Sequence, residues 1–313
     1  MNRKFANYLV IGLKGMGMGA ADVIPGVSGG TIAFITGIYE ELVNSIKSIN
    51  ASLLKTLFSK GIPAAWKQVN GNFLFSVLAG ILFSIFSLAR LISWLLTNHQ
   101  MLVWAFFFGL IVGSAIFVGR KIRKWNALTI TMLLGGTAIA YYITVATPAT
   151  TPEGLWFIFI SGAIAICAMI LPGISGSFIL LLMGKYEYIL NAVKDLKVDV
   201  LLVFAAGCAI GIVAFSNLIS WLFQKFHNAT LALLTGFMIG SLNKLWPWKE
   251  VIESRLNSKG EMVPFIEKSI APARYAEITG ESTLMIPILL CALAGLILIF
   301  VFEWLTHGVG EKA

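Results

Sequence analysis

The sequence predicts an all-α, multi-pass membrane protein with two inverted repeats. Each repeat has a re-entrant helical hairpin and two transmembrane helices; a linker span joins the repeats and a C-terminal span follows them. Three observations lead to this class. The 313 residues are 58% hydrophobic and 12% charged, with a mean hydropathy of +0.86, whereas a soluble domain carries about 25% charged residues. A short Pro-Gly motif occurs twice, and an odd number of membrane crossings separates its two copies.

The two copies of the motif indicate an internal duplication. They are Pro25-Gly26-Val27-Ser28-Gly29-Gly30 and Pro172-Gly173-Ile174-Ser175-Gly176-Ser177, at an offset of 147 residues (172 − 25). The same offset pairs Gly37 with Gly184, Tyr39 with Tyr186, Glu40 with Glu187, Asn44 with Asn191 and Lys47 with Lys194. A second match, residues 91–95 with 218–222, lies at an offset of 127 because the first repeat has a longer polar stretch.

These matches divide one membrane domain, residues 1–313, into consecutive parts. We expect repeat 1 at 1–125, the linker span at 126–154, repeat 2 at 155–246, and a polar loop with the final span at 247–313. A crossing needs about 20 apolar residues, and Pro followed by Gly interrupts a helix. A helical hairpin interrupted at membrane depth must be buried in protein or line a cavity.

In repeat 1, an apolar segment at 5–22 leads into the motif, and a helix at 28–47 leads out of it. Gly15 and Gly19 have the spacing that allows close helix packing. A polar stretch at 48–70 precedes two spans, and a tight turn at 98–100 joins these spans. The predicted spans are 73–97 and 101–119.

The linker span covers 127–147 and a Pro/Thr loop follows it. Repeat 2 then has the same order of segments, and after it come a polar loop and a last span. The predicted segments are 155–171, 175–194, 199–223 and 229–246, then the loop at 247–283 and the span at 284–305.

The parity of the crossings predicts the relation between the repeats. If both arms of each hairpin stay on one side, a repeat and the linker cross the membrane an odd number of times, so the second repeat is inverted. Two fully crossing arms also give an odd number, and only a single crossing arm would give parallel repeats. The basic segments 2–4, 47–67 and 120–124 then share one side. We expect that side, with the N-terminus, to be cytoplasmic.

The motif itself favours an anion. Ser is a preferred N-cap, and the glycines leave backbone N–H groups open at a helix start, where phosphate binds readily. A simple turn between two apolar helices is the alternative. The predicted phosphate-binding residues are Pro25, Gly26, Ser28, Gly29, Gly30 and Thr31 in the first copy, and Pro172, Gly173, Ser175, Gly176 and Ser177 in the second.

Charged residues at membrane depth are costly and are functional candidates. Lys14 or Arg90 could pair with a phosphate, and Asp22 or Glu40 could carry a coupling proton. Each has a structural alternative: Lys14 and Asp22 form a buried pair, and Arg90 snorkels to the interface. Glu40, like Lys185 and Glu187, could simply reach the interface. The predicted coupling or gating residues are Asp22, Glu40, Lys185 and Glu187.

Several other classes are disfavoured. The cysteines Cys167, Cys208 and Cys291 have no paired spacing, which argues against a disulfide or a metal site. The three histidines are far apart, so neither a metal nor a catalytic triad is expected, and no cofactor is predicted. The net charge of +8 is unevenly distributed and does not indicate nucleic acid. The oligomeric state is not predicted.

At these motifs the sequence resembles a known family. Lys14-Gly15, Gly19 to Asp22, Pro25 to Thr31, Gly37 to Glu40 and Leu171 to Phe178 are similar to the bacterial polyprenyl-phosphate translocase family PopT, formerly a domain of unknown function. The resemblance covers nearly the whole chain. It implies a bacterial plasma-membrane transporter that returns undecaprenyl phosphate, the lipid carrier of cell-wall precursors, from the outer to the inner leaflet. A proton or sodium ion would be the coupling ion.

A rival class is the membrane undecaprenyl-pyrophosphate phosphatases, which also use inverted re-entrant hairpins and a Pro-Gly-x-Ser motif. In that family an Arg follows the Ser, whereas Gly29 and Gly176 hold this position here. Without the cation, the charge of a leaving phosphate is poorly stabilised. We therefore expect binding without hydrolysis. A carrier of small anions using the same site is a third reading.

Overall fold

The computed structural model describes residues 5–24, 27–149, 151–152, 154–256 and 262–310. Four helices in this part of the chain are long and apolar enough to cross a membrane, namely α5, α6, α7 and α11. Two shorter apolar helices lie at Leu155–Ile170 and Met285–Val301. The expectation of a multi-pass membrane protein is therefore confirmed.

The first half begins with α1, which ends just before the first motif. The helix predicted at 28–47 is divided in two, because Gly37 has a φ of +73°, in the left-handed region that favours glycine. The polar stretch 48–70 is largely helical and is kinked at Gly61. The helices are α1 (Phe5–Asp22), α2 (Gly29–Ile35), α3 (Tyr39–Lys47), α4 (Ala51–Gln68), α5 (Gly71–Asn98) and α6 (Gln100–Arg120).

The second half repeats this order after the linker helix. The helix predicted at 175–194 is again divided, here at Gly184 with a φ of +62°. The two spans predicted at 199–223 and 229–246 are the two arms of α11, which bends at Phe226 (φ −134°, ψ 48°). The helices are α7 (Ala127–Val145), α8 (Leu155–Ile170), α9 (Gly176–Leu182), α10 (Tyr186–Lys194) and α11 (Val198–Ser241).

The backbone repeats at the two offsets found in the sequence. Helices α9 and α10 begin and end 147 residues (176 − 29) after α2 and α3. At the offset of 127 (226 − 99), the bend at Phe226 corresponds to the turn at His99, whose φ of −139° and ψ of 38° are nearly the same. Equivalent residues thus form equivalent turns in the two halves.

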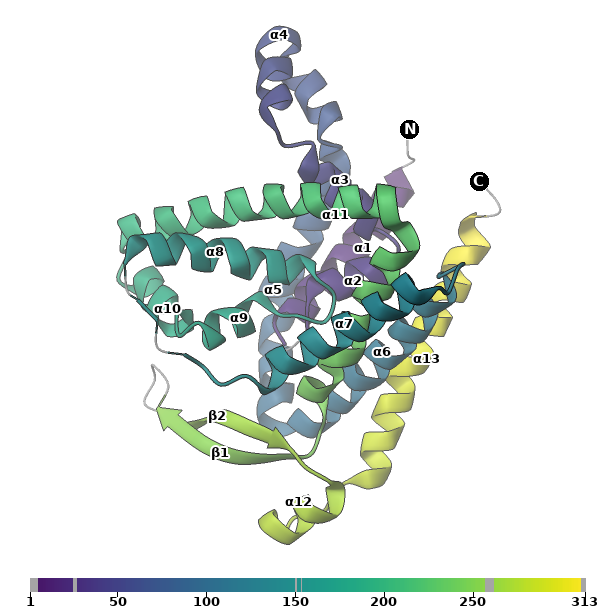
Figure 1. Ribbon diagram of the computed structural model, residues 1–313, viewed down its shortest axis with the longest axis vertical. Helices are drawn as coiled ribbons and strands as arrows, with labels where there is room; N and C mark the ends of the chain where they lie inside the picture. Colours follow the sequence, from purple (N-terminus) through teal and green to yellow (C-terminus); the bar gives the residue numbers. More distant parts are fainter. Residues whose placement is uncertain (1–4, 25–26, 150, 153, 257–261, 311–313) are drawn as a thin grey trace.

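The polar loop is not irregular, and the chain is not entirely helical. A 3₁₀ turn (Leu242–Leu245) leads into an antiparallel hairpin of β1 (Lys249–Leu256) and β2 (Met262–Ser269), in which Lys249 lies opposite Ser269. Val251, Ile252 and Ile266 supply the β-branched side chains typical of strands. Helices α12 (Pro272–Thr279) and α13 (Met285–Gly310) follow. Figure 1 shows the hairpin and α12 at the opposite end of the molecule from α4.

Glycines allow the helices to pack in close pairs. A Cβ at Gly15 would collide with the Val77 carbonyl of α5, and a Cβ at Gly207 with the Phe159 carbonyl of α8. The pairs α1/α5 and α8/α11 are therefore equivalent in the two halves. In the same way, Gly109 packs on α13 and its sequence match Gly236 packs on α7. The first half thus packs on α13 and the second half on α7.

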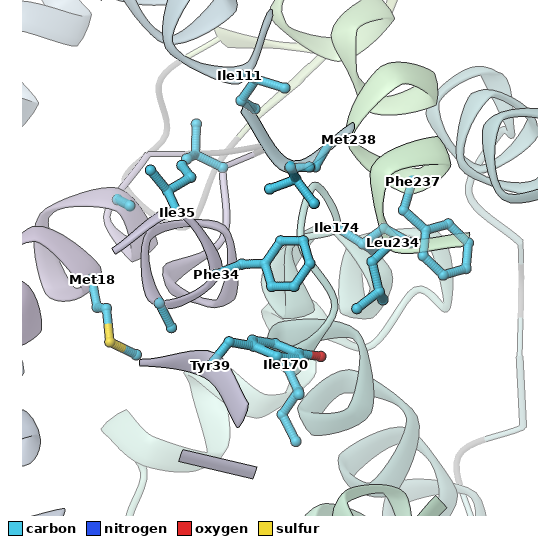
Figure 2. Packing of buried hydrophobic residues seen from close by; sticks show 14 of the residues in the cluster. Met18, Phe34, Ile35, Tyr39, Ile111, Ile170, Ile174, Leu234, Phe237 and Met238 are labelled. Carbon is cyan, nitrogen blue, oxygen red and sulfur yellow. The ribbon is translucent and has the colours of Figure 1, made fainter. Parts of the chain in front are cut away.

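The core lies where the two halves meet. Figure 2 shows Phe34 of α2 and Tyr39 of α3 beside Ile170 and Ile174, which lie at the second motif. Leu234 from α11 is next to them. Burial of these side chains from four elements fixes the two motifs relative to one another.

Candidate functional site

The two Pro-Gly motifs are in direct contact inside the protein. Ser28 Oγ donates a hydrogen bond to the Met169 carbonyl oxygen over 2.7 Å, and the Gly173 amide donates to Thr31 Oγ1 over 2.8 Å. Ser28 and Thr31 are fully buried. A Cβ at Gly30 would collide with the carbonyl of Ile170, so only glycine permits this approach. Residues at the two copies of the motif are thus held against one another.

In the first copy, the protein itself satisfies the open amides. The Gly29 amide donates to Asp22 Oδ1 over 2.6 Å, and the Gly30 amide donates to Ser28 Oγ over 3.1 Å. Ser28 is therefore the N-cap of α2, as the sequence predicts. The carboxylate of Asp22 lies where the sequence suggests an anionic ligand, because negative charge is stabilised at a helix N-terminus. Pro25 and Gly26 lie outside the described residues.

Lys14 contacts the other end of the same short helix. Its Nζ donates to the Thr36 carbonyl oxygen over 2.7 Å, and Thr36 is the C-cap of α2. One helix, α1, thus places an acid at the start of α2 and a base at its end. Both charges complement the dipole of α2. Lys14 and Asp22 therefore contact opposite ends of α2.

The second copy is arranged differently. The hydroxyls of Ser175 and Ser177 are hydrogen-bonded to each other over 2.8 Å, and Ser175 makes no side-chain cap with α9. Ser175 is buried and Ser177 is exposed, so the pair joins the interior to the surface. Gly173 has a φ of +89°, and a Cβ there would lie 2.7 Å from Ser241 Oγ. Pro172 and Gly176 are buried beside it.

The other predicted charges lie apart from the motifs. Glu40 is half exposed and pairs with His227 Nε2 at 3.4 Å. The two line a cavity of about 380 Å³ that also contains Lys121. Lys185 is buried, and its Nζ donates to the Thr151 carbonyl oxygen over 3.2 Å.

Two further candidates lie on helix surfaces. Glu187 is half-buried on α10, and Arg90 is exposed on α5. The exposure of Arg90 agrees with the snorkelling alternative more closely than with a place beside Ser28.

A pair of lysines that the sequence does not reveal lies next to the second motif. Lys244 Nζ lies 4.7 Å from the centre of the Phe178 ring, and Phe178 directly follows Ser177. Lys244 and Lys249 are 3.7 Å and 3.4 Å from the same oxygen of Glu267. Burial and the charge of Lys244 lower the pKa of Lys249 to about 8, although Glu267 opposes this. The signal is absent from the sequence because the β-hairpin brings these residues together.

Among the described residues, the two motifs contain no set of side chains typical of hydrolysis. Ser28 and Ser175 are each followed by glycine, and Ser28 is bonded to a carbonyl rather than to a base. Among these residues, no three His, Cys, Asp or Glu side chains are grouped as a metal would require.

Comparison with known proteins gives consistent matches. A family model described as undecaprenyl phosphate translocase-like matches residues 18–263. A polyprenyl-phosphate transporter of Vibrio cholerae is 48% identical over 303 residues, which is 97% of this chain and 98% of the relative. A polyprenyl-phosphate transporter of Staphylococcus aureus is 33% identical over 254 residues, which is 75% of this chain and 85% of the relative. No solved structure gives a significant match.

Proposed function

Because the chain belongs to the undecaprenyl phosphate translocase-like family, we propose that it transports a polyprenyl phosphate, undecaprenyl phosphate, across the bacterial plasma membrane. The two relatives carry the name polyprenyl-phosphate transporter, and the first covers nearly the full length of this chain. The protein is a transporter rather than an enzyme. Its direction would be from the outer to the inner leaflet, which recycles the carrier for cell-wall synthesis.

The observation that supports this function most is the contact between the two motifs. Ser28 and Thr31 of one copy bond to the backbone beside the other copy, in a buried position that both halves share. A carrier of a lipid phosphate needs one headgroup site that each leaflet reaches in turn. The apolar outer surface of the helices would accommodate the polyprenyl chain.

Asp22 has a specific role in this scheme. Its carboxylate holds the amide of Gly29 in the conformation described here. Protonation of Asp22 would weaken this hydrogen bond, since a charged acceptor binds an amide more strongly than a neutral one. A phosphate could then take its place at the first motif. Exchange of the carboxylate for the phosphate would couple a proton to transport.

The halves would be inverted relative to one another, because the sequence predicts an odd number of crossings between the two motifs. In this arrangement, α4 and the end of α6 face the cytoplasm, and the β-hairpin lies on the outer side, at the opposite end of Figure 1. The basic residues of α4 and of residues 120–124 fit the cytoplasmic side.

Reconstitution tests the function. Purified protein in liposomes should move polyprenyl phosphate between leaflets and should release no phosphate from polyprenyl pyrophosphate. Phosphate release that is lost in both Ser28→Ala and Ser175→Ala would overturn this proposal in favour of an enzyme. Empty liposomes and liposomes containing Lys268→Gln, a change on the exposed side of β2, are the controls.

A further inference from the structure

A buried lysine lies between the β-hairpin and α6. The side chain of Lys249 is only 6% exposed. Its Nζ donates to the Lys244 carbonyl oxygen over 2.8 Å and lies 3.5 Å from the centre of the Trp104 ring. Burying an ammonium group is costly unless it is paired. The Lys244 carbonyl and the Trp104 ring offset part of this cost for Lys249.

The cluster carries more positive than negative charge. Lys244 and Lys249 both face one oxygen of Glu267, at 3.7 Å and 3.4 Å. Two ammonium groups around one carboxylate leave a net positive charge when both are protonated. The side chains of Lys244 and Glu267 are also mostly buried, at 20% and 14% exposed, so water screens this excess weakly. The excess favours a further anion.

An unsatisfied donor lies in the same place. Trp104 Nε1 is buried and has no hydrogen-bond acceptor in the described part of the chain. A buried donor without a partner destabilises the folded protein, and phosphate oxygens are strong acceptors. The indole therefore adds a neutral donor to the two lysines.

The surroundings match the headgroup level of a membrane. Lys244 follows the end of α11, and Trp104 lies in the first turns of α6, so both are at the ends of spanning helices. Trp and Lys are typical of this level. Ser269, opposite Lys249 in the sheet, lines a cavity of about 400 Å³ together with Trp246. This cavity lies next to the cluster, although neither lysine nor Trp104 lines it.

We propose that Lys244, Lys249 and Trp104 bind the phosphate monoester of the lipid on the hairpin side of the membrane, and that Glu267 pairs with the lysines when the lipid is absent. The contact of Lys244 with Phe178 places this site next to the residue that follows Ser177 in α9. The headgroup would pass from the lysines to the hydroxyls of the second motif. This inference rests on the proposed function and names the entry site for its substrate.

Binding to the full chain in detergent micelles tests the site. Tryptophan fluorescence would follow titration with farnesyl phosphate, with farnesol as the uncharged control and inorganic phosphate as the soluble source. We expect farnesyl phosphate to bind, and Lys244→Gln and Lys249→Gln to bind it roughly tenfold or more weakly. Lys268→Gln removes the same charge from the exposed face of the same hairpin and should bind normally.

Glu267→Gln separates a binding role from a structural one. If Glu267 competes with the phosphate, this variant binds farnesyl phosphate more tightly, whereas loss of a purely structural ion pair gives no tighter binding. Equal affinity of the native protein, Lys244→Gln and Lys249→Gln would overturn the proposal. Equal affinity for inorganic phosphate and farnesyl phosphate would overturn the lipid as its ligand.

The liposome experiment keeps the two proposals distinct. Lysine variants that transport at the native rate would refute this site and leave the transport function intact. A native protein that binds farnesyl phosphate through the lysines but moves no polyprenyl phosphate would refute the transport function alone. Melting temperatures of each variant show whether a loss reflects unfolding.

Discussion

Ser28 donates its hydroxyl hydrogen bond to the carbonyl oxygen of Met169, 141 positions later in the chain and 2.7 Å away. The same oxygen atom of Ser28 accepts from the Gly30 amide. One hydroxyl therefore begins α2 and also joins the first motif to α8. This double role separates Ser28 from its sequence match, Ser175, which bonds only to Ser177 among the contacts of its side chain described here.

Replacing Ser28 with Ala should lower both stability and transport. The variant loses the N-cap of α2, which costs about 0.5–2 kcal/mol, and leaves the buried Gly30 amide without its acceptor. Ser175→Ala should lower the melting temperature less, because no cap depends on it. Transport in liposomes should fall in both variants. Two well-folded variants that transport at the native rate would show that neither hydroxyl contacts the substrate.

Asp22→Asn separates the charge of this residue from its structural role. The amide oxygen of Asn can still accept from the Gly29 amide, so the fold should be retained with a small loss of stability. We expect transport driven by a pH gradient across liposomes to be abolished, because Asn takes up no proton. Asp22→Ala should lower the melting temperature further. Native gradient dependence in Asp22→Asn would rule out this carboxylate as the proton carrier.

Single cysteines test the orientation in a variant lacking Cys167, Cys208 and Cys291. Exposed lysines of α4, α10 and β2 provide the positions, namely Lys55, Lys194 and Lys268. An impermeant thiol reagent on intact cells should label positions 194 and 268 but not 55, which should react only after permeabilisation. Labelling of 55 and 194 from the same side would contradict inverted repeats.

Lys249 should give the protein a characteristic dependence of stability on pH. Its pKa is about 8 in the folded protein, below the ordinary value of 10.5. Between these two pH values the unfolded chain therefore binds more protons, and stability increases as pH rises through this window. Below about pH 8 the burial cost is fully present. The charged groups that face Lys249 are Lys244 and Glu267.

Lys249→Met provides the matching measurement. Its melting temperature should lack the increase between pH 8 and 10.5 that the native protein shows. Affinity of the native protein for farnesyl phosphate should decrease over the same window, as Lys249 loses its charge. If the melting temperatures of the native protein and Lys249→Met change equally with pH across this window, Lys249 does not titrate there.

The duplication was the most informative feature of the sequence, and its reach has a physical limit. Matched residues such as Gly37 and Gly184 predict equivalent structure, yet a single glycine is also tolerated inside a helix, so the sequence does not reveal the breaks at these positions. Contacts of Lys14 and Asp22 with the ends of α2 depend on how α1 packs, which periodicity does not specify.

The same limit applies more strongly to the polar loop. Lys249 and Glu267 are adjacent only because β1 pairs with β2. The segments that contain them are too short and too polar to span a membrane, and they carry charges of both signs, so in the sequence they resemble an ordinary loop. Strand pairing between segments this short is decided by tertiary packing, and the lysine cluster becomes visible only with the structure.

The glycine contacts described above also decide how the protein can move. Within the pairs α1/α5, α8/α11, α6/α13 and α7/α11, the backbones touch, so one helix cannot slide along its partner without a collision. We therefore expect the two helices of each pair to move together. Bending is then expected between the helix pairs. His99 and Phe226 lie at two such positions and have nearly the same φ and ψ. We expect any movement that exposes the headgroup site to each leaflet in turn to take place at these two bends.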